Sequence, residues 1–143
     1  MTLGPLPDRI AAVRATAFFG HLAEDDVLQI ANRLTQPSFD KGVAVFRAGD
    51  PSDALFLLVR GRIAIRDGLS ALVTLEPPEC FGELGVLAEE PRSADAVCEA
   101  SCELSGLAST DLQALLRDRP AIQRQVMRGL VRRVKEAGRR ARQ

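Results

Sequence analysis

Short runs in which every second residue is apolar occupy the middle of the chain and limit its fold more than any other feature. The apolar residues of these runs are Val43, Val45, Leu55, Leu57, Val59, Ile63, Ile65, Leu69, Ala71, Val73 and Leu75. Turn signals separate the runs at Lys41-Gly42, Gly49-Asp50-Pro51, Arg60-Gly61, Asp67-Gly68 and Pro77-Pro78. Period-two alternation is typical of strands with one buried face, and several such strands predict an antiparallel sandwich or barrel.

Helical patterns flank the strands on both sides. Before them, Ile10, Val13 and Phe18 precede an acidic turn, Glu24 to Asp26, that suits the start of a helix. After them, Thr110 and Gln113 predict a capping box for a helix through Leu116. Pro120 fits the first position of a last helix. The apolar stripe expected on this helix is Ile122, Val126, Leu130, Val134 and Ala137.

These patterns predict one α+β domain over residues 1–143, of a length that buries a single core. We expect N-terminal helices in 7–36, an antiparallel barrel of about eight strands in 37–108 and C-terminal helices in 109–143.

Charge and composition exclude several classes of protein. Residues 117–143 carry a net charge of +8 and residues 1–116 carry −8, so a basic C-terminal segment follows an acidic body. Such a segment either binds nucleic acid or forms a solvated helix face that docks on the acidic body or faces water, and the second interpretation is preferred. The single histidine, His21, excludes a multi-histidine metal site, and three cysteines exclude a closed disulfide framework. Cys98 and Cys102 are interpreted as buried thiols, and the chain as cytoplasmic.

Residues 81–94 break the alternation and bring together groups that suit an anion. Gly82 allows a close backbone approach before a short helix that we expect over Glu83–Leu87. Arg92 offers a fork of donors that matches two phosphate oxygens, and Ser93 adds a hydroxyl. Glu83 is an acceptor suited to a sugar hydroxyl. No catalytic constellation is visible.

Gly82-Glu83-Leu84 followed by Pro91-Arg92-Ser93-Ala94 resembles the phosphate-binding cassette of cyclic nucleotide-binding domains. Such domains occur in catabolite-activator-type regulators, protein kinase A regulatory subunits and cyclic-nucleotide-gated channels. Gly49-Asp50, Asp53, Leu55, Val59, Gly61, Ile63, Leu75 and Phe81 extend the resemblance, which covers about residues 8–138. It implies an eight-stranded jelly roll, or double-stranded β-helix, flanked by helices.

The resemblance also implies a role for each site residue. Arg92 pairs with the cyclic phosphate, and Glu83 accepts from the ribose 2′-hydroxyl. The phosphate shell is completed by Gly82, Leu84, Ser93 and Ala94. The base pocket is formed by Ile65, Leu72, Val73 and Arg133, although one of Leu72 and Val73 must face away if they share a strand. Arg133 lies at the edge of the apolar stripe, where it either stacks on a purine or extends to solvent.

Two positions depart from the family pattern. Asp95 replaces a residue that is usually Ser, Thr or bulky, and its carboxylate would repel the phosphate if it faced the site. Ala137 and Gly138 replace two hydroxyl residues that hold the base in catabolite-activator-type proteins.

We therefore expect a non-catalytic sensor that binds cAMP, possibly cGMP, with no metal or other cofactor. The last helix is expected to close over the ligand as a lid and to report occupancy to a partner or an output domain outside the chain. We expect no membrane insertion and no nucleic-acid binding by these residues. The alternatives are a cAMP-binding fragment of a DNA-binding regulator, a fragment of a channel or transporter, and a degenerate scaffold that binds nothing.

Overall fold

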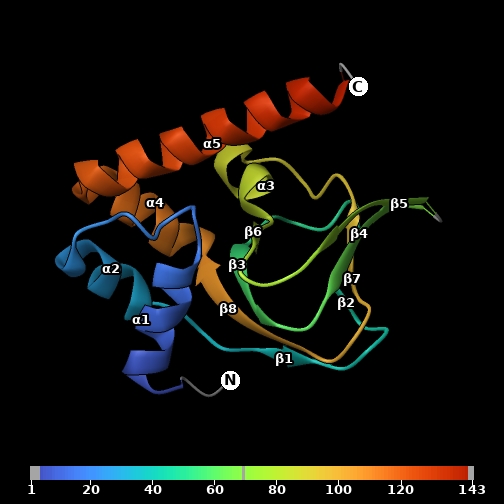
Figure 1. Ribbon diagram of the computed structural model, residues 1–143, viewed down its shortest axis with the longest axis horizontal. Coiled ribbons are helices and arrows are strands. Elements are labelled where there is room, and N and C mark those ends of the chain that lie inside the picture. Colours follow the sequence, from blue (N-terminus) through green and yellow to red (C-terminus); the bar gives the residue numbers. More distant parts are fainter. Residues whose placement is uncertain (1–3, 69, 142–143) are drawn as a thin grey trace.

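The computed structural model describes residues 4–68 and 70–141, so Leu69 lies outside the described residues. Within them the chain forms five helices and eight strands, in the order helix, strand, helix that the sequence predicts (Figure 1). The helices are α1 (Leu6–Ala15), α2 (Glu24–Ala31), α3 (Glu83–Ala88), α4 (Ser109–Asp118) and α5 (Pro120–Ala141). The strands are β1 (Ser38–Phe39), β2 (Ala44–Phe46), β3 (Ala54–Arg60), β4 (Ile63–Asp67), β5 (Ser70–Leu75), β6 (Cys80–Phe81), β7 (Asp95–Cys98) and β8 (Cys102–Ala108).

The strands form two four-stranded antiparallel sheets, in the orders β1-β8-β3-β6 and β2-β7-β4-β5. Apolar side chains from both sheets meet between them and form the inter-sheet cluster. Its buried members are Leu58, Ile63, Phe81, Ala96, Cys98, Cys102 and Leu104. This arrangement confirms the predicted jelly roll with flanking helices.

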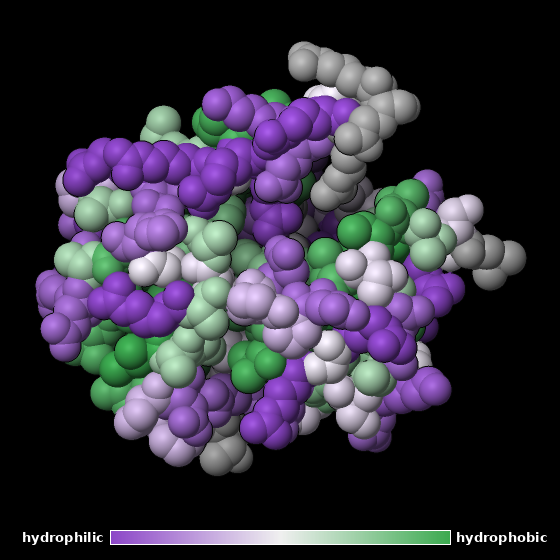
Figure 2. Space-filling view, in the orientation of Figure 1, coloured by the Kyte–Doolittle hydropathy of each residue, from purple (hydrophilic) through white to green (hydrophobic). Residues whose placement is uncertain are grey.

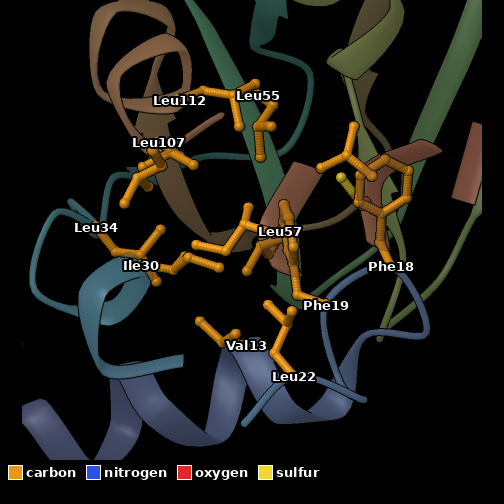
Figure 3. Packing of buried hydrophobic residues seen from close by; sticks show 14 of the residues in the cluster. Val13, Phe18, Phe19, Leu22, Ile30, Leu34, Leu55, Leu57, Leu107 and Leu112 are labelled. Carbon is orange, nitrogen blue, oxygen red and sulfur yellow. The ribbon is translucent and has the colours of Figure 1, made fainter. Parts of the chain in front are cut away.

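The helices cover the outer face of the first sheet and form a second core, the helix-side cluster (Figure 3). Leu55 and Leu57 of β3 contribute to it from the sheet, Ile30 and Ile122 from helices α2 and α5, and Phe19 from the turn between α1 and α2. All five are 0–1% exposed. Because side chains alternate along a strand, the same β3 places Leu58 in the inter-sheet cluster.

Two predictions for the C-terminal helices are wrong. Thr110 does not cap a helix, because β8 runs directly into α4 and the residue before its first turn is Ala108, which makes no side-chain cap bond. The amide of Ser109 instead donates to the carbonyl of Asp53 at 2.8 Å. The apolar stripe of α5 is buried only in its first half, since Val134 is 72% exposed. The side chain of Ala137 lies outside the described residues.

Among the described side chains, the basic C-terminal segment forms ion pairs with the acidic body through Arg119 at its start and through Arg133 near the middle of α5. Arg119 lies 2.7 Å from Asp25 and 3.1 Å from Asp26 in the first turn of α2. Further along α5, Arg124, Arg128 and Arg132 are exposed. Hydrophilic side chains accordingly cover the part of the surface where α5 lies (Figure 2).

Candidate functional site

A cavity of about 460 Å³ lies between the second sheet, α3 and the middle of α5. Most of its lining comes from residues 81–94, for which we keep the name cassette, and the rest from strands β2, β4 and β5 and from Arg133. In Figure 1, α3 lies directly beneath α5, between that helix and the strands. A larger cavity of about 650 Å³, between α1 and strands β1, β3 and β8, lies away from Glu83, Arg92 and Arg133. The smaller cavity is therefore the candidate site, because Glu83, Arg92 and Arg133 line it.

Arg92 is the buried cation of this cavity, with an exposed fraction of 5%. Its Nη1 donates to the carbonyl of Gly82 at 2.7 Å and its Nη2 donates to the carbonyl of Ala54. The guanidinium lies 4.0 Å from the ring centre of Phe46, close enough for a cation–π contact. Its Nε is buried without a hydrogen-bond partner among the described residues. Burial lowers the pKa of Arg92, while Asp53, Glu83 and Asp50 act in the opposite direction.

Backbone hydrogen bonds to the turn at Gly49–Asp50 fix the loop that carries Arg92. Its amide donates to the carbonyl of Asp50, and its carbonyl accepts from the amide of Gly49, both at 2.8 Å. Asp95 supports the same turn, since its Oδ1 accepts from the amide of Ala48 at 2.7 Å. Asp95 does not line the cavity. Its carboxylate therefore stabilises the turn and does not face the cavity. The repulsion of a bound phosphate that the sequence analysis considered for Asp95 is thus avoided.

Gly82 makes the close approach between the cassette and Arg92 possible. It has φ = 78°, in the left-handed region, and lies immediately before α3. A Cβ at this position would lie 2.8 Å from Nη1 of Arg92. The short helix predicted from Glu83 thus begins where the sequence placed it, and any side chain at position 82 would displace the arginine.

Glu83 is the buried anion of the cavity, and its carboxylate is paired. Its side chain is 3% exposed, and Oε1 lies 3.0 Å from Nε of Arg133. Burial raises the pKa of Glu83, while the neighbouring Arg133 and, more weakly, Arg92 lower it. The sequence singled out both Glu83 and Arg133 but did not predict that they contact each other.

All but one of the remaining residues predicted for the site line the cavity. Ser93, Leu84 and Ala94 line the cavity, as do Ile65 and Val73, which pair across β4 and β5. Leu72 is 61% exposed and is not part of the lining, so its assignment to the base pocket is wrong. The pairing of β4 with β5 is irregular here: Val73 pairs with Ile65 and Ala71 with Arg66, which leaves Leu72 as the extra, unpaired residue of β5.

Phe46 is the residue that the sequence analysis missed. Its ring lies against the guanidinium of Arg92, stacks on Phe56 with ring centres 6.4 Å apart, and packs in a tilted arrangement on Phe81 with ring centres 6.1 Å apart. Phe46 lies 46 positions before Arg92 in the chain, so no local motif connects the two. The one available signal was an aromatic residue directly before the turn at Arg47–Asp50.

Over residues 4–68 and 70–141, no three His, Cys, Asp or Glu side chains gather as ligands for a metal ion. In the same ranges, no helix is both long and apolar enough to cross a membrane.

The chain is similar to proteins that carry the same kind of module. The family model described as cyclic nucleotide-binding domain matches residues 36–119. A CRP-like cAMP-activated global transcriptional regulator of Mycobacterium tuberculosis is 31% identical over 134 residues, which cover 90% of this chain and 58% of the regulator. A cyclic nucleotide-gated potassium channel of Mesorhizobium japonicum is 30% identical over 110 residues, which cover 77% of this chain and 30% of the channel.

A solved structure gives the same result at the level of the fold. The catabolite activator protein of Thermus thermophilus superposes with a TM-score of 0.78 at 31% identity, covering 88% of this chain and 62% of that one. The chain thus spans less than two thirds of the length of these relatives. The matched family model covers β1 to α4 and includes the whole cassette, and on these grounds the chain belongs to the cyclic nucleotide-binding domain family.

Proposed function

We propose that this chain is a non-catalytic sensor module that binds cAMP in the cavity lined by the cassette. The observation that carries the proposal is the pair of buried opposite charges on one cavity wall, Arg92 and Glu83. Buried charges are costly unless they have partners, and the Nε of Arg92 has none among the described residues. A cyclic phosphate is an anion of suitable size and charge to accept from it.

Each group of the ligand has a counterpart in the cavity. The phosphate would pair with Arg92, and Ser93, Gly82, Leu84 and Ala94 would complete its shell. The ribose 2′-hydroxyl would donate to Glu83. The apolar side chains of Ile65 and Val73 would contact the base. The relatives support cAMP as the ligand, because the Mycobacterium tuberculosis regulator is named for activation by cAMP.

Two wider statements belong to the same proposal. The module reports occupancy through α5 to an output segment or partner, which in the relatives named above belongs to a transcriptional regulator or a channel. We also place it in the cytoplasm, because its three cysteines are unpaired, as is usual for thiols in a reducing compartment.

A calorimetric titration with cAMP tests the proposal. We expect Arg92→Ala to weaken binding by about 30-fold or more, because it leaves the phosphate without its charged partner. Arg47→Ala is the matched control: it removes one exposed arginine from the adjacent turn and should leave the affinity unchanged. Equal affinities of Arg92→Ala and the wild type would rule out the phosphate site, and the absence of binding to the wild type would rule out cAMP as the ligand.

A further inference from the structure

The ring of Phe46 in β2 covers one face of the Arg92 guanidinium. The guanidinium carbon lies 4.0 Å from the ring centre. This separation is within the range of about 6 Å over which a cation and an aromatic face attract each other. Both side chains line the cavity, and the attraction is stronger here than at the surface because Arg92 is 5% exposed. The ring is therefore a direct partner of the buried charge.

Two further rings from the opposite sheet fix the ring of Phe46. Phe56 of β3 and Phe81 of β6 pair across those strands, and their ring centres are 5.5 Å apart. The ring centre of Phe46 lies 6.4 Å from that of Phe56 and 6.1 Å from that of Phe81. A Cβ on Gly82 would lie 3.4 Å from Cε2 of Phe46, so the ring edge also lies close to the cassette backbone. Because protein interiors are close-packed, a ring with neighbours on these sides has little freedom to move.

The groups that contact the Arg92 guanidinium share one property, which is that they carry no charge. Its two Nη atoms donate to backbone carbonyls, and its face meets the ring of Phe46. Among the residues that the structure describes, no carboxylate forms an ion pair with it. Arg133, the other arginine that lines the cavity, is by contrast paired with Glu83 at 3.0 Å. The guanidinium of Arg92 is thus held in place with its positive charge not neutralised.

We propose that Phe46 is a positioning residue of the anion site, whose ring holds the Arg92 guanidinium in place without neutralising it and so keeps the charge for the ligand's phosphate. This inference rests on the proposed function, because it requires a ligand whose phosphate reaches Arg92. A carboxylate in place of the ring would also hold the guanidinium, but it would compete with the phosphate for the positive charge. An aliphatic side chain would fill the space without attracting the charge. An aromatic ring fills the space, attracts the cation and stays neutral.

Calorimetric titrations of two leucine variants with cAMP test this role. Phe46→Leu removes the ring that contacts the guanidinium, and we expect it to weaken binding by about 3- to 30-fold. Phe56→Leu is the matched control, because it removes a ring from the same group of three but from a side chain that does not line the cavity. Its affinity for cAMP should stay close to that of the wild type. Equal affinities of Phe46→Leu and the wild type, or equal losses in the two variants, would overturn the proposal.

The same substitution in the Arg92→Ala background separates positioning from packing. If the ring acts on the phosphate through the guanidinium, Phe46→Leu should cause no further loss of cAMP affinity once the arginine is absent. A loss that persists without Arg92 would show that the ring only shapes the cavity, and it would overturn the proposal.

Nuclear magnetic resonance tests the contact in the wild type, so this test does not depend on a variant that folds. The ring current of Phe46 should move the Arg92 guanidinium protons, observed at Nε, upfield of those of exposed arginines. We expect this shift to remain when cAMP binds, to disappear in Phe46→Leu and to persist in Phe56→Leu. Absence of the shift in the wild type, or its loss on binding cAMP, would overturn the positioning role.

Failure of the proposed function would give a different result. If the wild type does not bind cAMP, the proposed function fails and the positioning role fails with it. If the wild type and Phe46→Leu bind cAMP equally well, the proposed function stands and only the role of Phe46 fails.

Discussion

Arg92 is both the cation of the proposed site and a structural residue. The sequence analysis gave it a role only in anion binding, but the structure shows it buried and bonded to the carbonyls of Gly82 and Ala54. We expect Arg92→Ala to lower the free energy of unfolding by about 1–3 kcal/mol, because two buried acceptors lose their donor. Urea denaturation measures this change. The control, Arg47→Ala, should stay within about 0.5 kcal/mol of the wild type, and a similarly small change in Arg92→Ala would contradict the structural role.

The raised pKa of Glu83 predicts a pH dependence of ligand binding. The ionised carboxylate accepts the stronger hydrogen bond from a ribose hydroxyl, and burial shifts its protonation to a higher pH than that of an ordinary glutamate. We therefore expect cAMP affinity to fall as the pH is lowered from about 7 toward about 5. Calorimetric titrations of the wild type and Glu83→Gln across this range measure the effect. The variant should bind cAMP more weakly and should lack this part of the dependence, whereas parallel curves would assign the titration to another group.

The base wall predicts weak discrimination between purines. Ile65 and Val73 present apolar surface and read no hydrogen-bond pattern, and Ser93 is short enough to accommodate both ligands. We expect cAMP to be preferred over cGMP by no more than about 30-fold, or about 2 kcal/mol. A competition titration measures the ratio, and a preference for cGMP would leave the site in place but change its ligand.

Residues that work through a local motif were predictable from the sequence, and residues that meet across the fold were not. Gly82, Glu83 and Arg92 lie within eleven positions of each other, and the structure brings them to one cavity. The contact of Arg133 with Glu83 joins positions 50 residues apart. Its existence depends on where α5 crosses α3, which no periodicity encodes.

At the scale of elements, α5 shows the limit of a periodic pattern. Its apolar spacing predicted the helix and Pro120 predicted its first residue, but neither predicted how far along the helix burial continues. Val134 has the spacing of a core residue and is 72% exposed, because the helix extends beyond the cluster that its first half covers. Periodicity identifies a face, and only the length of the opposing surface decides how much of that face is buried.

Two glycines of α5 differ in their surroundings and give a matched test of its packing. A Cβ on Gly129 would lie 2.6 Å from a ring carbon of Phe18, which is itself packed edge-on against Phe19, whereas a Cβ on Gly138 meets nothing within 4 Å. Alanine gains about 1 kcal/mol of helix propensity at either position. At position 129 the clash costs about 1–3 kcal/mol, so we expect Gly129→Ala to be neutral or destabilising and Gly138→Ala to be stabilising.

Thermal unfolding followed by circular dichroism measures both changes. Since the two variants share the same gain in propensity, their difference isolates the contact between α5 and Phe18. Equal stabilisation by both would mean that α5 moves away from Phe18 without cost.

At the scale of the whole molecule, one strand belongs to both cores. Leu55 and Leu57 of β3 face the helix-side cluster and Leu58 faces the inter-sheet cluster. Exposing either cluster to solvent would also expose one face of β3. The chain should therefore unfold as one cooperative unit, despite its two separate groups of buried side chains.

Calorimetry tests this cooperativity together with ligand binding. We expect a single unfolding transition whose calorimetric and van't Hoff enthalpies agree. At a cAMP concentration about 100 times the dissociation constant, the whole transition should shift, with a stabilisation of about 2.7 kcal/mol. Two transitions, of which only one responds to cAMP, would show that the strands and the helices unfold separately.

The position of Phe46 beneath Arg92 has a practical consequence for spectroscopy. The chain contains no tryptophan and no tyrosine, so the native protein lacks the usual intrinsic fluorophores. A tryptophan placed at position 46 would be the sole indole of the molecule, with the guanidinium of Arg92 against the face of its ring. Its emission would follow every movement of that arginine. A single substitution in β2 would thus turn the cavity into an optical reporter of its own occupancy.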